Sequence, residues 1–269
     1  MQPLSPADIP VVILCGGRGT RLKEETEWRP KPMVSVGDRP ILWHIMKIYA
    51  TYGFRRFVLC LGYKGDMIRD YFLNYDLKNS DICVELGSKR ITKLSRDHDE
   101  SNWSVSLIDT GQESMTGGRL KIAGQYLLNE LNDTFCLTYG DGVANINLSQ
   151  LLDFHIQKQK LATITAVRPS SRYGELFTEK GIVKLFTEKP QTQEGWINGG
   201  FFILNTKVLD LIESTATIWE REPLQKLVDL GELAVYEHTG FWQCMDTYRE
   251  MELLNKLWID GSAPWRVWP

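Results

Sequence analysis

The chain has 269 residues, of which 43% are hydrophobic and 24% charged, and its formal net charge is -3. These proportions are typical of a globular protein with a sizeable core, and they argue against disorder or low complexity. A slightly acidic chain has no general nucleic-acid-binding face, so any phosphate-binding site must be a local cluster of cations.

The sequence predicts a cytoplasmic protein without nucleic-acid or membrane partners. Its first residues lack the basic stretch and apolar core of a secretory signal, and no window approaches the roughly 18 apolar residues of a membrane span. The five cysteines are odd in number and contain no CxxC pair. We therefore expect buried, reduced thiols and neither disulfides nor metal ligands.

Apolar runs and helical patterns alternate along the chain. A helix is predicted from Pro40 to Gly53, and another over residues 147–160 with Asn147 as its cap. The apolar runs are typical of strands buried on both faces of a sheet, and they occupy residues 10–14, 57–61, 105–109, 134–139, 162–167 and 199–204. This alternation predicts an α/β fold with an open, mostly parallel sheet, whose ligands bind beyond the carboxyl ends of the strands.

The C-terminal part is expected to differ. Shorter runs at residues 180–186 and 232–238 favour a small antiparallel addition on one side. Residues 88–103 form a charged, poorly periodic segment, which we interpret as a solvated loop, with a flap or an oligomer contact as alternatives. The three tryptophans of residues 257–269 are typical of a tail docked on the protein or on another subunit.

A glycine-rich segment follows the first apolar run, at residues 14–22. Gly16, Gly17 and Gly19 can turn their backbone N–H groups toward an anion at the end of the strand. The spacing matches neither the Walker A motif nor the dinucleotide fingerprint, and a plain strand-to-helix turn is the alternative. Arg21 favours phosphate binding, because a guanidinium grips phosphate oxygens bidentately.

Lys31 stands between Pro30 and Pro32. The two prolines fix the backbone around this lysine, so that its side chain reaches one place reproducibly. The alternative is a rigid loop with a solvated lysine. With the glycine-rich segment nearby, polyphosphate binding is the stronger interpretation.

Asp141 and Asp246 are candidate ligands for Mg²⁺. Asp141 ends an apolar run, where a carboxylate suits a cation, although Asp-Gly is also a common tight-turn pair. Asp246 begins a helical pattern, and a helix N-cap is the alternative. Mg²⁺ prefers such oxygen ligands, keeps several waters and relies on substrate phosphates.

A reaction between two phosphates would need little acid–base chemistry. If the second substrate is a sugar 1-phosphate, it is already largely dianionic at neutral pH and requires no general base. Catalysis then reduces to aligning two anions and neutralising their repulsion, a task for Arg21, Lys31, backbone amides and Mg²⁺. The sequence offers no convincing Ser-His-Asp or Cys-His arrangement.

Ten stretches follow one another across nearly the whole chain: LCGGRGTRL, RPKPM, PILWHIMKIY, LGYKGDMIRDYF, DTGQESMTGGRLK, LTYGDGVANI, EKP, INGGFFILN, WEREPL and GFWQCMDT. In this order they resemble the sugar nucleotidyltransferase family, and DTG, SMTGGRL and FWQCMDT resemble its cytidylyl branch. The resemblance implies one Rossmann-like, three-layer domain over residues 1–269, with a mostly parallel mixed sheet flanked by helices. Residues 1–8 would be an N-terminal extension and 240–269 a C-terminal helix and Trp-rich tail.

The resemblance also implies a reaction. The phosphate of glucose 1-phosphate would attack the α-phosphorus of CTP in line, with Mg²⁺, giving CDP-glucose and pyrophosphate. It further implies a homo-oligomer that supplies CDP-sugars for dideoxysugar and surface polysaccharide (O-antigen) synthesis.

The site residues are carried over by position. Arg21, Lys31, Asp141 and Asp246 would be catalytic, the two aspartates as the metal ligands. The nucleotide would contact Leu14, Cys15, Gly16, Gly17, Arg18, Gly19, Thr20, Arg21, Lys31, Ser114, Arg119 and Gly140. The sugar phosphate would contact Glu188, Lys189 and Asn198. Residues 170–177 depart from the family's RFGAL-like loop, which leaves sugar preference less defined than nucleotide chemistry.

Three alternatives remain at this point. Uridylyl or thymidylyl transfer to another sugar 1-phosphate uses the same chemistry, and neither periodicity nor spacing identifies the base. A glycosyltransferase would usually hold its metal through a D-x-D motif, whereas YGDG offers one acid. A non-catalytic nucleotide-sugar sensor would be expected to lack an acid, Arg21 or Lys31, and all are present.

Overall fold

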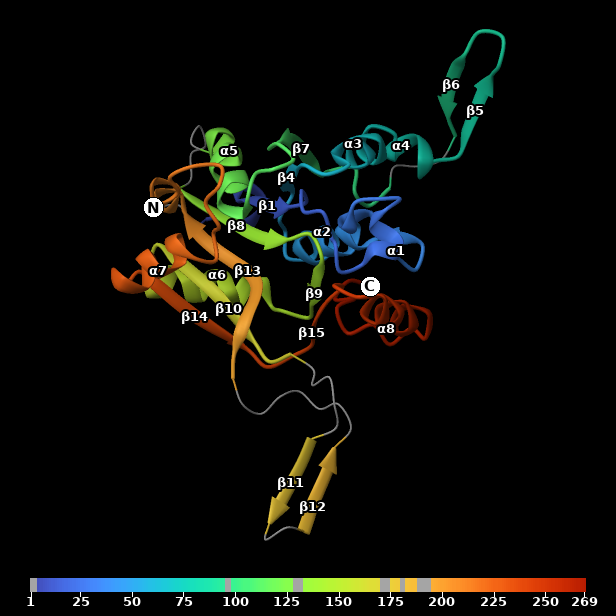
Figure 1. Cartoon of the computed structure of the whole chain (residues 1–269). Coiled ribbons are helices and arrows are strands. Elements are labelled where there is room, and N and C mark those ends of the chain that lie inside the picture. The colour runs from blue at the N-terminus through green and yellow to red at the C-terminus, as the bar shows by residue number, and fades with distance from the viewer. Residues whose placement is uncertain (1–3, 95–97, 128–132, 170–174, 180–181, 188–194) are drawn as a thin grey trace.

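The computed structural model describes residues 4–94, 98–127, 133–169, 175–179, 182–187 and 195–269. Within these residues, the centre is a seven-stranded sheet with the order β14–β10–β13–β8–β1–β4–β7 (Figure 1). Its strands are β1 (Pro10–Leu14), β4 (Arg56–Leu61), β7 (Ser104–Asp109), β8 (Thr134–Tyr139), β10 (Ala162–Val167), β13 (Ile197–Asn205) and β14 (Leu233–His238).

The sheet is mixed and mostly parallel. Strands β8, β1, β4 and β7 run parallel, as do β10 and β14, whereas β13 is antiparallel to both of its neighbours. The predicted α/β class is confirmed. Residues 232–238, however, were expected in an antiparallel addition and instead form the parallel edge strand β14, because alternating polarity marks a half-exposed strand and not its direction.

The antiparallel addition is the hairpin of β11 (Glu175–Glu179) and β12 (Ile182–Thr187), which lies apart from the central sheet (Figure 1). Another hairpin, of β5 (Ile82–Glu85) and β6 (Arg90–Lys93), projects from the opposite end of the molecule. The expectation of a plain loop from residue 88 is therefore wrong over β6, which pairs with β5 while remaining largely exposed.

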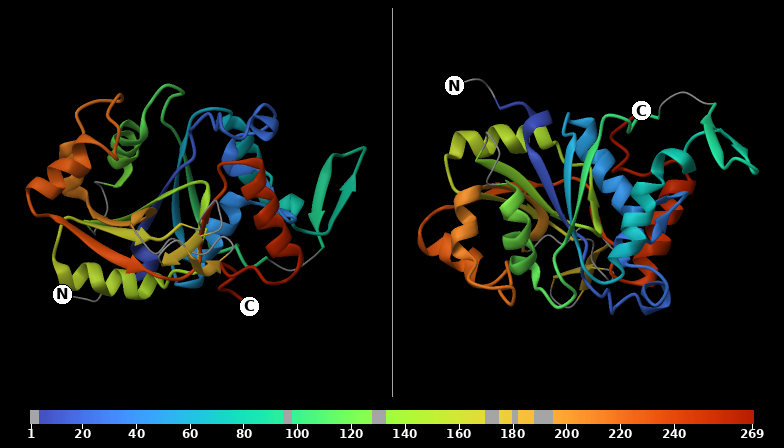
Figure 2. Two further views of the ribbon diagram at one scale, coloured as in Figure 1. Left: turned by 60° about the horizontal axis from the view of Figure 1, so that its bottom comes forward. Right: turned by 90° about the horizontal axis from the view of Figure 1, so that it is seen from above.

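Helices cover both faces of the sheet (Figure 2). Along β1, Val11 and Ile13 belong to one apolar core, and Val12 and Leu14 to the other, because successive strand residues point to opposite faces. The first core is covered by α2 (Ile41–Thr51), α6 (Leu148–Lys158) and α8 (Tyr248–Ile259). The second is covered by α5 (Thr116–Leu127), α7 (Glu222–Asp229) and the 3-10 helix η3 (Thr206–Leu211).

Both predicted helices are confirmed. Pro40 is the N-cap of α2, and the side chain of Asn147 accepts a hydrogen bond from the backbone N–H of Gln150 at the start of α6. The run at residues 105–109 was expected to be buried on both faces, but β7 is an edge strand whose side chains are only partly covered.

Of the two interpretations of the C-terminal tail, docking on the protein itself or on another subunit, the structure shows the first. Trp258, Trp265 and Trp268 surround His44 of α2, with ring centroids 4.5 to 6.2 Å away. The remaining elements are η1 (Pro6–Asp8), α1 (Lys23–Thr26), η2 (Lys31–Met33), β2 (Ser35–Val36), β3 (Arg39–Pro40), α3 (Gly65–Leu73), α4 (Tyr75–Lys78), β9 (Gly142–Ala144) and β15 (Trp242–Cys244). None of the helices in the described part of the chain is long and apolar enough to cross a membrane.

Candidate functional site

A cavity of about 330 Å³ opens where β1 and β8 end, the edge at which ligands of such sheets bind. Its walls come from the loop after β1, the η2 turn, the start of α5, the turn after β8 and the segment before α8. The lining residues are Leu14, Cys15, Gly16, Gly17, Gly19, Thr20, Arg21, Lys31, Pro32, Ser114, Met115, Thr116, Arg119, Tyr139, Gly140, Asp141 and Asp246.

Two glycines of the loop after β1 are required by their surroundings. A Cβ atom on Gly16 would lie 2.1 Å from Nη1 of Arg119, so a larger residue would displace that guanidinium. Gly19 has a φ of +61°, a conformation that other residues rarely adopt, and a Cβ atom there would lie 2.7 Å from Cγ2 of Thr26. The loop therefore brings its backbone close to the cavity.

Lys31 lies in η2 and is buried, with 9% of the residue exposed. Its Nζ donates to Oδ2 of Asp141 at 2.6 Å and also to Oδ1 of Asp246. Burial lowers the pKa of Lys31, but the two carboxylates outweigh burial, so the net pKa is raised. The ammonium therefore remains charged at neutral pH.

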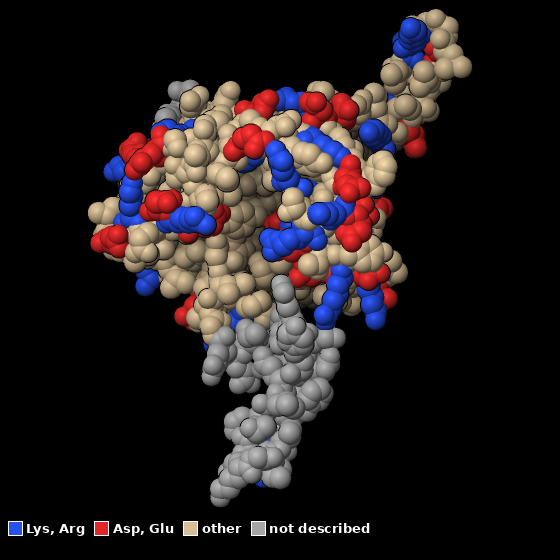
Figure 3. All heavy atoms as spheres, in the orientation of Figure 1, with Lys and Arg blue, Asp and Glu red and all other residues tan. Residues whose placement is uncertain are grey.

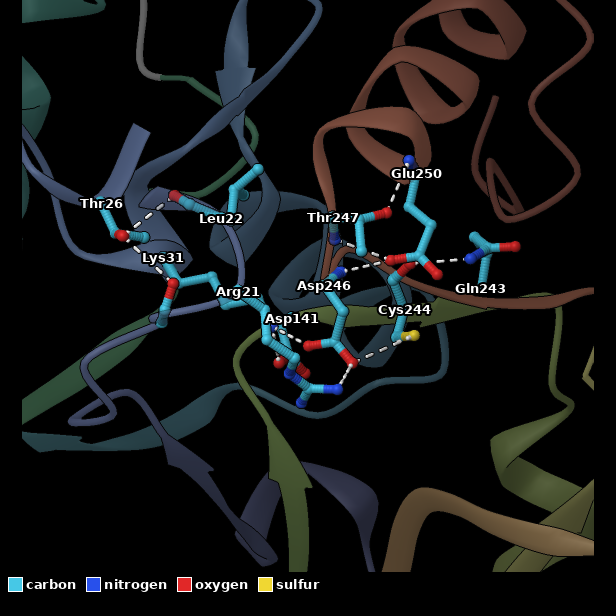
Figure 4. A network of polar contacts seen from close by, with 11 residues as sticks. Arg21, Leu22, Thr26, Lys31, Asp141, Gln243, Cys244, Asp246, Thr247 and Glu250 are labelled. Carbon is cyan, nitrogen blue, oxygen red and sulfur yellow. Dashed lines mark hydrogen bonds and ion pairs between the residues drawn. The ribbon is translucent and has the colours of Figure 1, made fainter. Parts of the chain in front are cut away.

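Asp141 and Asp246 meet because two short strands pair. Asp141 lies in the turn between β8 and β9, and β9 pairs antiparallel with β15, which ends just before Asp246. The backbone N–H of Met245 also donates to the carbonyl oxygen of Asp141 at 2.8 Å. Residues 105 positions apart (246 less 141) are thereby held with their carboxylates on the same ammonium (Figure 4).

The start of α8 fixes the backbone of Asp246. The N-cap is Thr247, which forms a capping box with Glu250, so the interpretation of Asp246 as a helix cap is wrong. Oε2 of Glu250 accepts from the N–H groups of both Asp246 and Thr247 at 2.8 Å. The Asp246 carboxylate thus remains directed toward Lys31 and toward Arg21, whose Nη1 lies 2.9 Å from Oδ2 (Figure 4).

The two carboxylates fit a hard divalent cation. Each contacts the same Nζ atom, so one cation lies within reach of both. Across the described residues, no group of three or more His, Cys, Asp or Glu side chains is arranged to hold a metal. A pair of carboxylates is the donor set expected for Mg²⁺, which completes its coordination with water and substrate phosphates.

Arg119 lines the cavity but has its guanidinium committed to the protein. It donates at 2.7 to 3.1 Å to the carbonyl oxygens of Gly16, Leu61, Gly111 and Gln112 and to the hydroxyl of Thr110. This buried side chain ties the loop after β1 to the segment after β7. In this arrangement both Nη atoms of Arg119 are used to stabilise the wall of the cavity.

Four predicted residues lie outside the cavity lining or outside the described part of the chain. Arg18 is exposed and pairs with Glu113, outside the lining. The Asn198 side chain donates from Nδ2 to the Tyr139 hydroxyl at 3.0 Å, so it reaches the cavity wall through that tyrosine. Glu188 and Lys189 fall outside the described residues.

Four lining residues were not predicted: Pro32, Met115, Thr116 and Tyr139. Sequence position alone could have indicated them, because each lies within two positions of a predicted residue. Tyr139 also ends a buried strand next to Gly140 and Asp141. On the face shown in Figure 3, basic and acidic side chains are intermixed.

Comparison with known proteins identifies relatives of this chain. The sequence model of the family described as "Nucleotidyl transferase" matches residues 10–247. The glucose-1-phosphate cytidylyltransferase of Salmonella typhi is 49% identical over 257 residues, which cover 96% of this chain and 98% of the relative. A probable glucose-1-phosphate cytidylyltransferase of Bacillus subtilis is 45% identical over 258 residues, covering 96% and 99%.

A solved structure has the same fold. HddC from Yersinia pseudotuberculosis superposes with a TM-score of 0.68 at 24% identity, covering 93% of this chain and 99% of that one. At this identity the likeness concerns the fold alone.

Proposed function

Because the chain belongs to the nucleotidyl transferase family, we propose that it transfers the cytidylyl group of CTP to α-D-glucose 1-phosphate, forming CDP-glucose and pyrophosphate. The two relatives described above, one named a glucose-1-phosphate cytidylyltransferase and the other a probable one, are 45 to 49% identical to this chain over 96% of its length. The observation that carries the proposal is the convergence of Lys31, Arg21 and two carboxylates at a cavity walled by the glycine-rich loop.

The cations would neutralise two anionic reactants. Lys31 is charged, held between prolines and buried, so it offers a fixed positive charge to the α-phosphate that is attacked. Arg21 is more exposed and stands at the mouth, where it would hold the outer phosphates. Asp141 and Asp246 would hold Mg²⁺, which supplies further charge neutralisation at the triphosphate.

No general base is required. The sugar 1-phosphate oxygen is already ionised near neutral pH, so the protein has only to align it with the α-phosphorus and exclude water. The backbone N–H groups of the glycine-rich loop would hold the triphosphate in line. Asn198, with Glu188 and Lys189 from the resemblance, would hold the sugar phosphate.

The resemblance also leads us to propose a homo-oligomer acting in the cytoplasm, where its product would supply dideoxysugars of surface polysaccharide. Light scattering on the purified protein measures the oligomeric state.

A substrate panel tests the reaction. Purified protein with Mg²⁺ is incubated with CTP, UTP, dTTP, ATP or GTP and with glucose, galactose or mannose 1-phosphate, while pyrophosphate is measured. We expect the fastest release with CTP and glucose 1-phosphate. Equal or faster turnover with UTP or dTTP would contradict the cytidylyl assignment. CTP binding without turnover in any combination would indicate a sensor, and sugar transfer without pyrophosphate a glycosyltransferase.

A further inference from the structure

Glu220, in the segment before α7, accepts hydrogen bonds from two hydroxyl groups. Oε1 accepts from the Tyr139 hydroxyl at 2.5 Å, and Oε2 accepts from the Thr116 hydroxyl at 2.6 Å. The Tyr139 hydroxyl in turn accepts from Nδ2 of Asn198 at 3.0 Å. We call Thr116, Tyr139, Asn198 and Glu220 the Glu220 bridge.

The bridge joins two sides of the cavity. Thr116 begins α5 directly after Ser114 and Met115, and all three residues line the cavity on the side assigned to the nucleotide. Asn198 lies on β13 and belongs to the side assigned to the sugar phosphate. Glu220 does not line the cavity itself, so it would act through its partners and not on a substrate.

The direction of each hydrogen bond in the bridge is fixed. An ionised carboxylate only accepts, so both hydroxyl groups must donate to Glu220. Burial, and then the neighbouring Glu220, raise the pKa of Tyr139, which keeps its phenol protonated and able to donate. Its lone pair is then left for Nδ2 of Asn198, whose Oδ1 accepts from the backbone N–H of Gly200 at 2.9 Å.

The surroundings reserve space for this arrangement. Gly200 has a φ of +82°, and a Cβ atom there would lie 2.5 Å from Cδ2 of Tyr139. On the other side, the Thr116 hydroxyl accepts from the backbone N–H of Trp219, and the N–H of Met115 donates to the carbonyl of Thr215, both at 2.9 Å. Backbone and side-chain hydrogen bonds therefore both join the segment before α7 to the start of α5.

We propose that Glu220 is a positioning residue that holds both substrate sides of the cavity at once, Asn198 through Tyr139 and the Ser114–Thr116 segment through Thr116. The proposal rests on the transfer reaction proposed above. Glu220 stands in the WEREPL stretch, to which the resemblance had assigned no role.

Steady-state kinetics of three variants test the bridge. Tyr139→Phe keeps the ring but frees Asn198, so KM for glucose 1-phosphate should rise about tenfold with little change in KM for CTP. Thr116→Val frees the start of α5 and should raise KM for CTP selectively. Glu220→Gln removes the charge that strengthens both hydrogen bonds and replaces one acceptor oxygen by a donor, so it should raise both KM values.

A double-mutant cycle separates positioning from general loosening. Because Tyr139 would act on Asn198 together with Glu220, the double variant Tyr139→Phe/Glu220→Gln should raise KM for glucose 1-phosphate, relative to the wild type, by less than the product of the two single effects. The matched control is Glu222→Gln, an exposed glutamate two positions along the chain, which should leave both KM values within about twofold.

The outcomes are distinct. Wild-type KM values in Glu220→Gln, or fully multiplicative effects in the double variant, would overturn the bridge. A fall in melting temperature with unchanged KM values would reduce Glu220 to a structural role. If Glu220→Gln does not fold, the other two variants still test the proposal. Tyr139→Phe should raise KM for glucose 1-phosphate alone and Thr116→Val should raise KM for CTP alone, and the absence of this difference would overturn the bridge. Should wild-type protein release no pyrophosphate from CTP and glucose 1-phosphate, the proposed function fails, and the same KM split is then measured on the pair that the panel identifies.

Discussion

Lys31 is the residue at which the charges of the site meet. Its ammonium contacts Asp141 and Asp246, and Arg21 approaches the far side of Asp246. Two positive and two negative side chains therefore nearly cancel before any ligand arrives. An incoming triphosphate would compete with the carboxylates for Lys31 and Arg21, while a divalent cation would compete with Lys31 for the carboxylates.

At this scale, we expect Asp141→Asn and Asp246→Asn each to lower kcat by at least about 10²-fold. Asparagine keeps the shape of the side chain but removes the negative charge that would hold the metal. Pyrophosphate release at saturating CTP and glucose 1-phosphate measures the effect, and Mn²⁺ titration followed by electron paramagnetic resonance measures the loss of metal affinity.

Asp153→Asn is the matched control, because Asp153 is exposed on α6 away from the cavity. It should retain wild-type kcat. Full activity in either site variant would mean that the metal is held elsewhere.

Sequence reasoning selected Arg21, Lys31, Asp141 and Asp246, and the structure brings them together at the strand ends; their catalytic roles stay predictions. It did not find the contact of Glu220 with Tyr139. The acceptor of the Tyr139 hydroxyl depends on tertiary packing between segments 81 positions apart, and no local pattern encodes it. The same holds for Arg119, whose buried donors turn to backbone carbonyls that the sequence does not distinguish.

The first turn of α8 helps to position Asp246. The Glu250 carboxylate accepts from the N–H groups of Asp246 and Thr247, so the cap of the helix also sets the direction of the Asp246 side chain. A structural motif of helix termini thereby supports a proposed metal ligand.

We expect Glu250→Ala to lower the free energy of unfolding by about 1 kcal/mol, the usual contribution of a helix cap, and to lower kcat several-fold as Asp246 gains freedom. Urea unfolding and pyrophosphate release measure the two effects. Glu252→Ala, at an exposed position of the same helix, should change neither. If the two variants behave alike, the cap does not position Asp246.

The sequence predicted the order and type of the elements more accurately than the direction of the strands. Residues 134–139 and 199–204 are both apolar runs, yet β8 runs parallel to its neighbour β1, whereas β13 runs antiparallel to both of its neighbours. Burial on both faces determines the apolar pattern, and direction depends on the connections between strands.

The C-terminal tail packs against the rest of the molecule through an aromatic cluster around His44, which is fully buried. Nε2 of His44 donates to the carbonyl oxygen of Val36 at 2.9 Å, and its Nδ1 accepts from the Trp265 indole at 3.4 Å. Both contacts suit a neutral ring. Burial lowers the pKa of His44 to about 4, with smaller opposing effects from the Val36 hydrogen bond and Asp38.

This predicts a loss of stability in mild acid. Above a pH of about 6.5 the histidine is neutral in both states and contributes no pH dependence. As the pH falls from about 6.5 toward 4, the unfolded chain binds a proton that the folded chain does not. His44 then costs about 1.4 kcal/mol of stability per pH unit. His155, whose burial also lowers its pKa to about 4, should add to the trend.

Urea unfolding at pH 7.5, 5.5 and 4.5 measures the effect. His44→Gln does not titrate and can still donate to Val36, so its stability deficit relative to the wild type should shrink as the pH falls. A constant deficit across the three pH values would show that His44 titrates normally in the folded protein.

The pairing of β9 with β15 has a consequence for how the protein is made. The ribosome releases the glycine-rich loop, Lys31 and Asp141 well before it has synthesised Asp246, which lies 215 positions after Lys31. A nascent chain, or one ended early by a premature stop codon, can therefore carry most of one wall of the cavity while lacking the second carboxylate. Completion of the final strand and helix is then the step at which the chain acquires its full set of charges.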